Sequence, residues 1–445
     1  MIKIYKIHKI VGLTSGVLLL LLAITGFLLN HSNWNFLYTT TSEADSITLI
    51  DKDKRLFESY YIDKNDEDYI LVATKRGLYE SDDGGLDFEK ILNIQATNIK
   101  SSKDNVYVST SDGLYKRTEN GYKRILLKGI YLTSLSIHNN IALVVEEKKY
   151  IYTIDLSKNK ILNKTTAIID TKDLQSDIPL SRLVRDLHIG VGLFDDGISL
   201  LISDFSTIFL IFFSFSGYYI WYLIKNKKSA KQSRKFIKYH SNILAIFASL
   251  FLIVLAITGV IFNHTNEFRN FLRTTQISHQ VLPPVYNTLK EDIWAIDYDG
   301  KDYRIGNRIG VYKSQDLSNW TKENNGSVYK MDRLDGKLYV SGRGSTNRVL
   351  ENNKYSIIPR TPQMLRNVIN IDNEVAFLHF KTTKVNFPEY EDVTLYSIIL
   401  AIHNGSFFST WWFWLYDFAS VAIIVLGLTG TYRWYIKKFP RRAKF

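Results

Sequence analysis

Six of the nine histidines in this chain stand at the ends of long apolar runs. An ionisable side chain at membrane depth is costly, so such residues are candidates for function by default. The six form three pairs, and the members of each pair occupy similar positions in the two halves of the chain. The pairs are His8 with His240, His31 with His264, and His188 with His403.

The chain has no cysteine. This excludes disulfides, thiolate zinc sites, iron–sulfur clusters, cysteine nucleophiles and covalent haem attachment through CxxCH. Two imidazoles that face each other across a helical bundle most simply bind haem iron. Zinc fits less well, because the pairs lie at different depths and lack a third ligand. We therefore expect two b-type haems at opposite depths, which would form an electron path across a membrane.

The inner haem is expected to lie between His8 and His240. On the outer side there are four candidate ligands, more than one haem needs. His31 with His264, His188 with His403, or mixed pairs could hold it, and the sequence leaves these alternatives open. All six histidines could instead be interfacial residues, since an imidazole ring tolerates the headgroup zone.

Two aspartates, Asp204 and Asp417, are the only charged residues inside the apolar runs. We expect each carboxylate either to orient a ligand histidine through a hydrogen bond or to cap or line its helix near the outer surface.

Four apolar runs are long enough to cross a membrane, because a bilayer core of about 30 Å requires about 20 apolar residues in a helix. They cover residues 11–29, 198–224, 241–263 and 406–432. Basic residues gather before the first run, between the second and third, and after the fourth. Such flanks stay in the cytoplasm. The net charge of +12 is therefore explained by membrane topology and not by nucleic-acid binding.

The chain is an internal duplication. Leu22-Ala23-Ile24-Thr25-Gly26 recurs as Leu255-Ala256-Ile257-Thr258-Gly259, and Asp204-Phe205 recurs as Asp417-Phe418. Two like halves predict a four-helix bundle, a duplicated two-helix unit with a pseudo-twofold axis along the membrane normal.

The expected domain organisation alternates membrane helices with two large periplasmic segments. It consists of helix 1–31, β segment 32–187, helix 188–224, a cytoplasmic basic loop 225–240, helix 241–264, a second β segment 265–402, and a helix with a cytoplasmic tail 403–445.

Both outside segments have the short strands and the Gly, Asn and Asp turns of all-β structure. Residues 81–88 resemble an Asp-box hairpin, and 314–320 are a weaker copy. A propeller blade takes about 40–45 residues, so each segment could supply three to four blades and the two could close one propeller of about seven. Two separate β domains are the alternative.

Short motifs resemble those of PepSY-associated transmembrane proteins. Residues 7–12 (IHKIVG) are similar to the opening helix of that family, and 186–190 (DLHIG) are similar to its second signature. The resemblance implies a bacterial inner-membrane protein related to b-haem reductases of ferric siderophores. It also places four histidines on the family's histidine positions, namely His8, His188, His240 and His403. The outside segments show no clear PepSY domain.

The leading hypothesis is a b-haem transmembrane electron-transfer protein, acting as a ferric siderophore reductase in the inner membrane. Because the sequence carries no nicotinamide, flavin or P-loop motif, electrons would come from quinol or a separate reductase. The acceptor would be a periplasmic iron chelate, and membrane lipid would surround the helices. The rivals are a non-redox, membrane-anchored propeller receptor or assembly factor, and a transporter.

Overall fold

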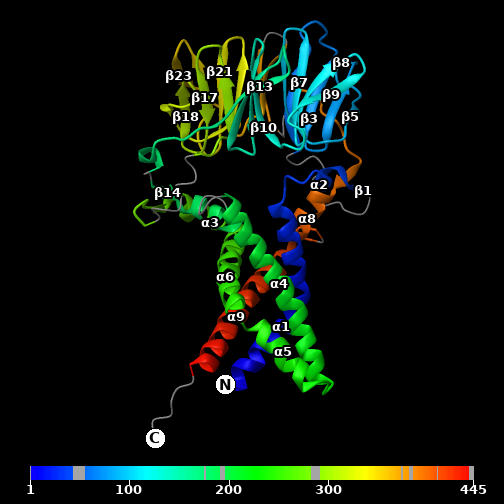
Figure 1. The fold of residues 1–445 in the computed structure, drawn as a ribbon, viewed down its shortest axis with the longest axis vertical. Coiled ribbons are helices and arrows are strands. Elements are labelled where there is room, and N and C mark those ends of the chain that lie inside the picture. Colours follow the sequence, from blue (N-terminus) through cyan, green and yellow to red (C-terminus); the bar gives the residue numbers. More distant parts are fainter. Residues whose placement is uncertain are drawn as a thin grey trace.

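The computed structural model describes residues 2–43, 56–174, 177–190, 196–281, 291–371, 374–379, 384–407 and 409–439. A helical bundle carries β-sheets at one end (Figure 1). Within the described residues, four helices are long and apolar enough to cross a membrane, which confirms the four predicted spans. They are α1 (Ile2–Asn30), α4 (Asp196–Lys225), α6 (Ile243–Asn263) and α9 (Phe413–Lys438).

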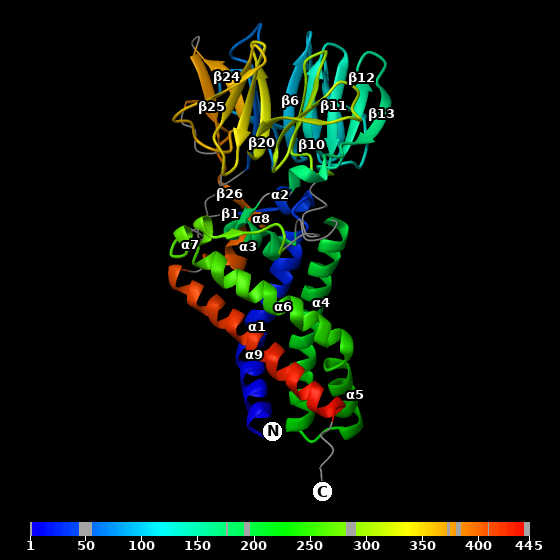
Figure 2. The same ribbon diagram turned by 90° about the vertical axis from the view of Figure 1, so that its left-hand side faces the viewer.

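The four long helices pack in a closed cycle, in which α1 contacts α4 and α9, and α6 contacts the same two helices. Figure 2 shows α6 and α9 running side by side. Small residues at the contacts let helices approach closely in lipid. The middle of the bundle is an apolar layer, centred on Leu19, Ala23, Leu210, Leu252 and Ala419.

Part of the segment expected as a basic loop is helical. Helix α5 (Ala230–His240) begins after Ser229, whose side chain accepts a hydrogen bond from the Gln232 amide. His240 therefore ends α5, whereas from the sequence it was expected at the end of a loop.

Two short helices, α3 (Leu180–Ile189) and α8 (Leu395–Asn404), precede α4 and α9. Each ends at a glycine in the left-handed region, Gly190 with φ 67° and Gly405 with φ 79°. That conformation costs glycine little and lets the chain turn sharply into the following segment. Helix α3 packs on α6 and α8 packs on α1, so each short helix lies against the other half of the chain. The 3₁₀ turn η3 (Thr410–Trp412) links α8 to α9.

The connections to the β-sheets also cross between the halves. After α1, α2 (Phe36–Thr39) leads to β1 (Thr41–Glu43), which pairs with β26 (Asp392–Thr394) before α8. After α6, α7 (Arg269–Thr274) leads to β15 (Gln276–Ile277), which pairs with β14 (Ile178–Pro179) before α3. The two halves are thus interlocked.

The first outside segment forms three antiparallel four-stranded sheets, followed by the 3₁₀ turn η1 (Thr171–Leu174). The strands are β2 (Phe57–Ile62), β3 (Ile70–Thr74), β4 (Gly77–Ser81) and β5 (Glu89–Leu92); β6 (Ala96–Ser102), β7 (Asn105–Thr110), β8 (Gly113–Thr118) and β9 (Gly121–Leu126); and β10 (Leu132–His138), β11 (Ile141–Glu146), β12 (Tyr150–Asp155) and β13 (Lys160–Thr166).

The second outside segment forms two four-stranded sheets and one two-stranded sheet within the described residues. The strands are β16 (Ala295–Tyr298), β17 (Tyr303–Gly306), β18 (Gly310–Ser314) and β19 (Thr321–Asn325); β20 (Val328–Leu334), β21 (Lys337–Gly342), β22 (Arg348–Glu351) and β23 (Lys354–Ile357); and β24 (Asn367–Ile371) and β25 (Glu374–Leu378).

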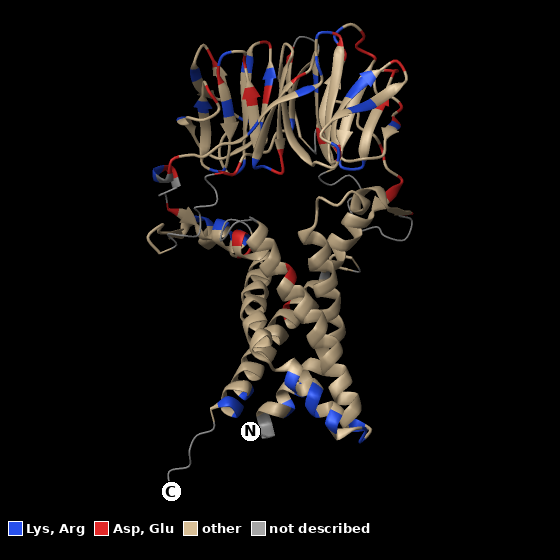
Figure 3. Cartoon of the chain, viewed as in Figure 1, with Lys and Arg blue, Asp and Glu red and all other residues tan. Residues whose placement is uncertain are grey.

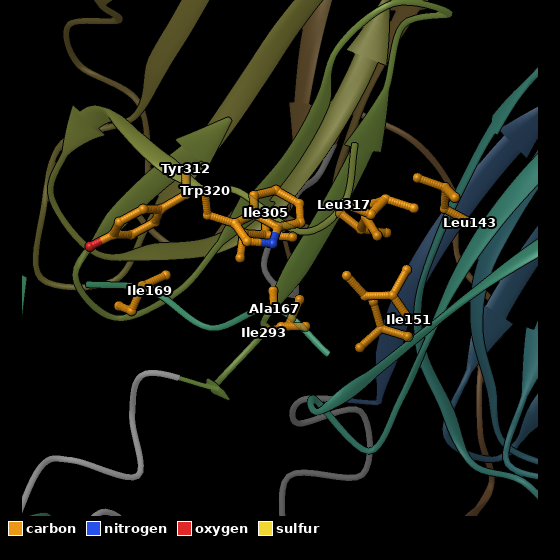
Figure 4. Packing of buried hydrophobic residues seen from close by; sticks show 11 residues of the cluster. Leu143, Ile151, Ala167, Ile169, Ile293, Ile305, Tyr312, Leu317 and Trp320 are labelled. Carbon is orange, nitrogen blue, oxygen red and sulfur yellow. The ribbon is translucent and has the colours of Figure 1, made fainter. Parts of the chain in front are cut away.

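The first strands of these sheets contact one another in the order β2, β6, β10, β16, β20 and β24, and β24 contacts β2 again. We call this arrangement the β ring. The described residues give it six sheets, where the sequence suggested about seven. A hydrophobic cluster joins Leu143 and Ile151 of the first segment to Ile305, Tyr312 and Trp320 of the second (Figure 4). The two outside segments therefore share a core.

Both Asp-box sequences form turns. The Asp83 carboxylate accepts hydrogen bonds from the Leu86 amide at 2.9 Å and the Ser81 hydroxyl at 2.7 Å. Asp316 accepts them from the Asn319 amide at 2.8 Å and the Ser314 hydroxyl at 2.9 Å. These carboxylates hold hairpins in place, which is a structural role.

Candidate functional site: two pairs of buttressed histidines

The inner pair lies at the end of the bundle farthest from the β ring. His8 projects from α1 and His240 from the end of α5, with ring centres 6.4 Å apart and ring planes at 88°. Nδ1 of His8 lies 2.8 Å from the hydroxyl of Thr429 on α9. Nδ1 of His240 lies 2.7 Å from the hydroxyl of Ser216 on α4.

The outer pair lies at the other end, on the two short helices. Nδ1 of His188 on α3 is 3.0 Å from the hydroxyl of Thr258 on α6. Nδ1 of His403 on α8 is 2.9 Å from the hydroxyl of Thr25 on α1. All four contacts join one half of the chain to the other.

The hydroxyl groups fix which ring nitrogen carries the proton. Each hydroxyl donates its own hydrogen to the carbonyl oxygen four residues earlier, so its oxygen is left to accept from the imidazole. Nδ1 of each histidine therefore carries the hydrogen, and Nε2 keeps its lone pair, as a metal ligand requires. These donor bonds run from Thr25 to Leu21 at 2.8 Å, from Thr258 to Val254 at 2.8 Å, from Thr429 to Val425 at 2.6 Å and from Ser216 to Phe212 at 2.5 Å.

A glycine follows each of the four hydroxyl residues and lies against the same histidine ring. A Cβ atom on Gly26 would stand 3.3 Å from Cε1 of His403, and one on Gly259 would stand 3.4 Å from Cε1 of His188. At the inner pair the corresponding distances are 3.5 Å from Gly430 to His8 and 3.9 Å from Gly217 to His240. We call each Ser/Thr-Gly dipeptide a cradle.

The cradled rings lie within the protein but are only half-buried, so each keeps some accessible surface. Burial lowers the pKa of His188 and of His403 to about 4. The pKa of His240 is also lowered to about 4, by burial and then by the neighbouring His8 and Arg433. These imidazoles are therefore neutral near pH 7, the protonation state in which histidine binds a metal.

The remaining pair has a different environment. Nε2 of His31 lies 3.1 Å from Asp204, and Nε2 of His264 lies 2.9 Å from Asp417. Both contacts stay within one half of the chain. The His31 ring also stacks on Trp34, with ring centres 4.2 Å apart. The Asp417 hydrogen bond raises the pKa of His264. In His31 and His264, therefore, Nε2 faces a carboxylate, whereas in the cradled rings Nε2 carries a free lone pair.

No group of three or more histidine, aspartate or glutamate side chains in the described part of the chain is arranged to hold a metal ion. His279 lies on the surface, 3.4 Å from Asp177. His138 packs edge-on against Tyr298.

Sequence analysis did not identify the four cradles as part of the site. The signal was present, because Thr25-Gly26 and Thr258-Gly259 end the repeated LAITG sequence, and Ser216-Gly217 matches Thr429-Gly430. The partner of each hydroxyl lies far away in sequence and became visible only in the fold.

Comparison with solved structures gives only loose similarities. One is YCF48 from Cyanidioschyzon merolae, at 11% identity and a TM-score of 0.31, with 72% of this chain and 70% of that chain covered. Another is the extracellular domain of the putative one-component system BT4673 from B. thetaiotaomicron, at 10% identity and a TM-score of 0.34, with 76% and 39% covered. Similarities at this level of identity and TM-score do not indicate a function for this chain.

No curated protein matches the sequence. The family model for the PepSY-associated TM region matches residues 140–437, more than half of the chain. That range includes α3 to α8, all but the last residue of α9, and three of the four cradled histidines. This chain is a membrane protein that belongs to the PepSY-associated TM family.

Proposed function

We propose that this protein carries electrons across a membrane through two b-type haems. His8 and His240 would hold the inner haem, and His188 and His403 the outer one. The observation that carries the proposal is the geometry of the inner pair. A metal bound by two imidazole nitrogens at about 2 Å each separates the ring centres by roughly 6 Å. The rings of His8 and His240 stand 6.4 Å apart.

The residues around the four rings fit such a group. Each cradle hydroxyl accepts the Nδ1 hydrogen, which leaves Nε2 without a proton and fixes the orientation of the ring. This is the usual role of a hydrogen-bond partner to a metal-binding histidine. When bound, haem supplies a one-electron iron couple. The chain's own residues supply binding, orientation and an apolar surrounding.

The two pairs lie at opposite ends of the bundle, with the apolar layer between them. Phe213 belongs to that layer and packs edge-on against His240, with ring centres 5.2 Å apart. This arrangement supports transfer from one membrane face to the other.

Lys and Arg residues gather at the end of the bundle where α1 begins and α9 ends (Figure 3). The positive-inside rule supports a cytoplasmic location for that end, and hence a periplasmic location for the β ring, in a bacterial inner membrane. The closed order of first-strand contacts supports a six-bladed propeller for the ring.

Electrons would enter from quinol or a separate reductase at the inner pair and leave from the outer pair to a periplasmic ferric chelate, such as a siderophore. This direction is supported by the family resemblance of the four histidines. Under this proposal the protein is a transmembrane haem-dependent reductase.

The test is the absorption spectrum of the full-length protein purified from haem-replete cells. We expect a Soret band, an α-band that appears on dithionite reduction, and two haems per chain by the pyridine haemochrome assay. A colourless preparation would overturn the proposal and favour a membrane-anchored receptor or assembly factor.

A further inference from the structure

One arginine of the β ring contacts the helix that carries His188. Arg308 lies in the hairpin between β17 and β18, and its Nη1 is 3.1 Å from the carboxylate of Asp186 on α3. Asp186 is fully buried and stands two residues before His188. The Arg308 guanidinium also lies 3.3 Å from the Asp292 carboxylate, which fixes its position within the ring.

A second arginine contacts the segment that carries His403. Arg76 lies in the hairpin between β3 and β4 and forms a salt bridge with Asp392. Its Nη1 also donates to the Asp392 carbonyl oxygen at 3.2 Å, and its guanidinium lies 4.2 Å from the centre of the Tyr390 ring. Asp392 begins β26, which ends at Thr394, the residue whose hydroxyl caps α8.

These two arginines occupy equivalent places in the duplicated architecture. Each lies between the second and third strands of the first sheet that its segment contributes to the ring. Each also reaches the short helix or cap segment that returns to the bundle at the end of the other segment. The two arginine side chains are 5% and 10% exposed, but Asp186 is fully buried whereas Asp392 is 31% exposed. The ion pair of Arg308 is therefore the better shielded from water, where screening is weak.

We infer that Arg76 and Arg308 are positioning residues that tie α8 and α3 to the β ring and thereby set the spacing of the outer histidine pair. The effect of these arginines on haem binding rests on the proposed function. Their contacts with the two helix segments do not depend on any bound group. Loss of one partner weakens a buried group of ion pairs. Without Arg308, Asp186 keeps its contacts with Arg182 and Arg185, which lie on α3 itself at 3.7 Å each, but it loses its ion pair with the β ring.

The experiment compares Arg308→Gln, Arg76→Gln and a control, Arg366→Gln, in the full-length protein. Arg366 is a matched control because its ion pair with Glu58 is similarly buried, with side chains 13% and 11% exposed, but joins two strand regions inside the ring. Hydrogen–deuterium exchange of the backbone amides reports on each short helix whether or not a haem is bound.

In Arg308→Gln we expect exchange in α3 to accelerate by at least about tenfold, with α8 unchanged. Arg76→Gln should accelerate α8 and leave α3 unchanged, and the control should change neither. In haem-loaded protein, Arg308→Gln and Arg76→Gln should each lose the outer haem and keep the inner haem. The inference would be overturned if α3 and α8 exchanged at the same rates in all three variants. It would also be overturned if Arg308→Gln and Arg76→Gln lost both haems equally.

Arg76→Lys and Arg308→Lys provide a second test if a Gln variant does not fold. Lysine keeps the charge but lacks the planar fork of arginine, so the acceleration should be smaller but confined to the same helix. If the wild-type protein binds no haem, the proposed function fails, and the exchange data still decide whether the arginines hold the two helices.

Discussion

The inner and outer histidine pairs share one kind of cradle but differ in what carries the rings. One inner ring lies on α1, which is itself one of the four long helices, and the other lies on α5, which packs against α4. The outer rings lie on the separate helices α3 and α8, each of which turns away at a glycine and contacts the β ring. The inner histidine pair therefore depends on the helices alone, whereas the outer pair also depends on the β ring.

The largest expected effect comes from removing a cradled histidine. If the chain binds haem as proposed, His240→Ala should abolish the inner haem and keep the outer one, and His188→Ala should do the reverse, because each would remove one of two iron ligands. The measurement is haem content per chain together with a redox titration. The matched control is His264→Ala, which should retain both haems. Loss of the outer haem in that control would show that the outer ligands were wrongly assigned.

Removing a cradle hydroxyl should weaken only one site. Valine in place of Thr429 or Thr258 keeps the shape of the side chain but leaves an Nδ1–H group without its acceptor. Loss of such a partner typically lowers metal-site affinity roughly 10- to 100-fold. We expect Thr429→Val to weaken the inner haem and Thr258→Val the outer, measured by haem transfer to an apo-globin. Serine at the same positions should restore binding, and failure of that rescue would argue against the hydroxyl's role.

The cradle glycines should differ in their tolerance of alanine. The added Cβ would be 3.3 Å from the His403 ring at Gly26, but 3.9 Å from the His240 ring at Gly217. Gly26→Ala should therefore displace an outer ring and lower outer haem affinity by up to roughly tenfold. Gly217→Ala should behave as wild type in the same transfer assay. The opposite order would contradict the ring positions.

The smallest effect concerns the histidines that face carboxylates. Asp417 raises the pKa of His264 above 6.5, so the pair stabilises the folded state fully below pH 6.5 and less as pH rises through the raised value. Because the pair is partly exposed, the contribution should be at most about 1 kcal/mol. Thermal unfolding of wild type and Asp417→Asn should differ most near pH 5.5 and converge at high pH. A constant difference from pH 5 to 9 would exclude this linkage.

Much of the helical framework could be predicted from sequence, because membrane spans and duplicated motifs are local signals. The uncharged stretches around Leu19 and Leu252 identify two spans directly. Residue type and position alone also identified the histidines as candidate ligands. The cradles could not be predicted, because Thr25 and His403 are far apart in sequence and meet only after both halves pack.

The β ring was predicted less completely for the same reason. Asp83 and Asp316 indicated hairpin turns, which depend on nearby residues. The order in which sheets contact one another depends on a hydrophobic cluster that includes Leu143 of the first segment and Tyr312 of the second. Likewise, nothing near Arg308 in the sequence indicates that it meets Asp186.

Because every cradle lies in one repeat and the histidine that it contacts lies in the other, a single repeat contains no cradled histidine. A protein corresponding to residues 1–228 would need a second subunit of its own kind to rebuild even one pair. The duplication therefore has the form expected if two identical ancestral subunits, each supplying half of both sites, became joined in one polypeptide.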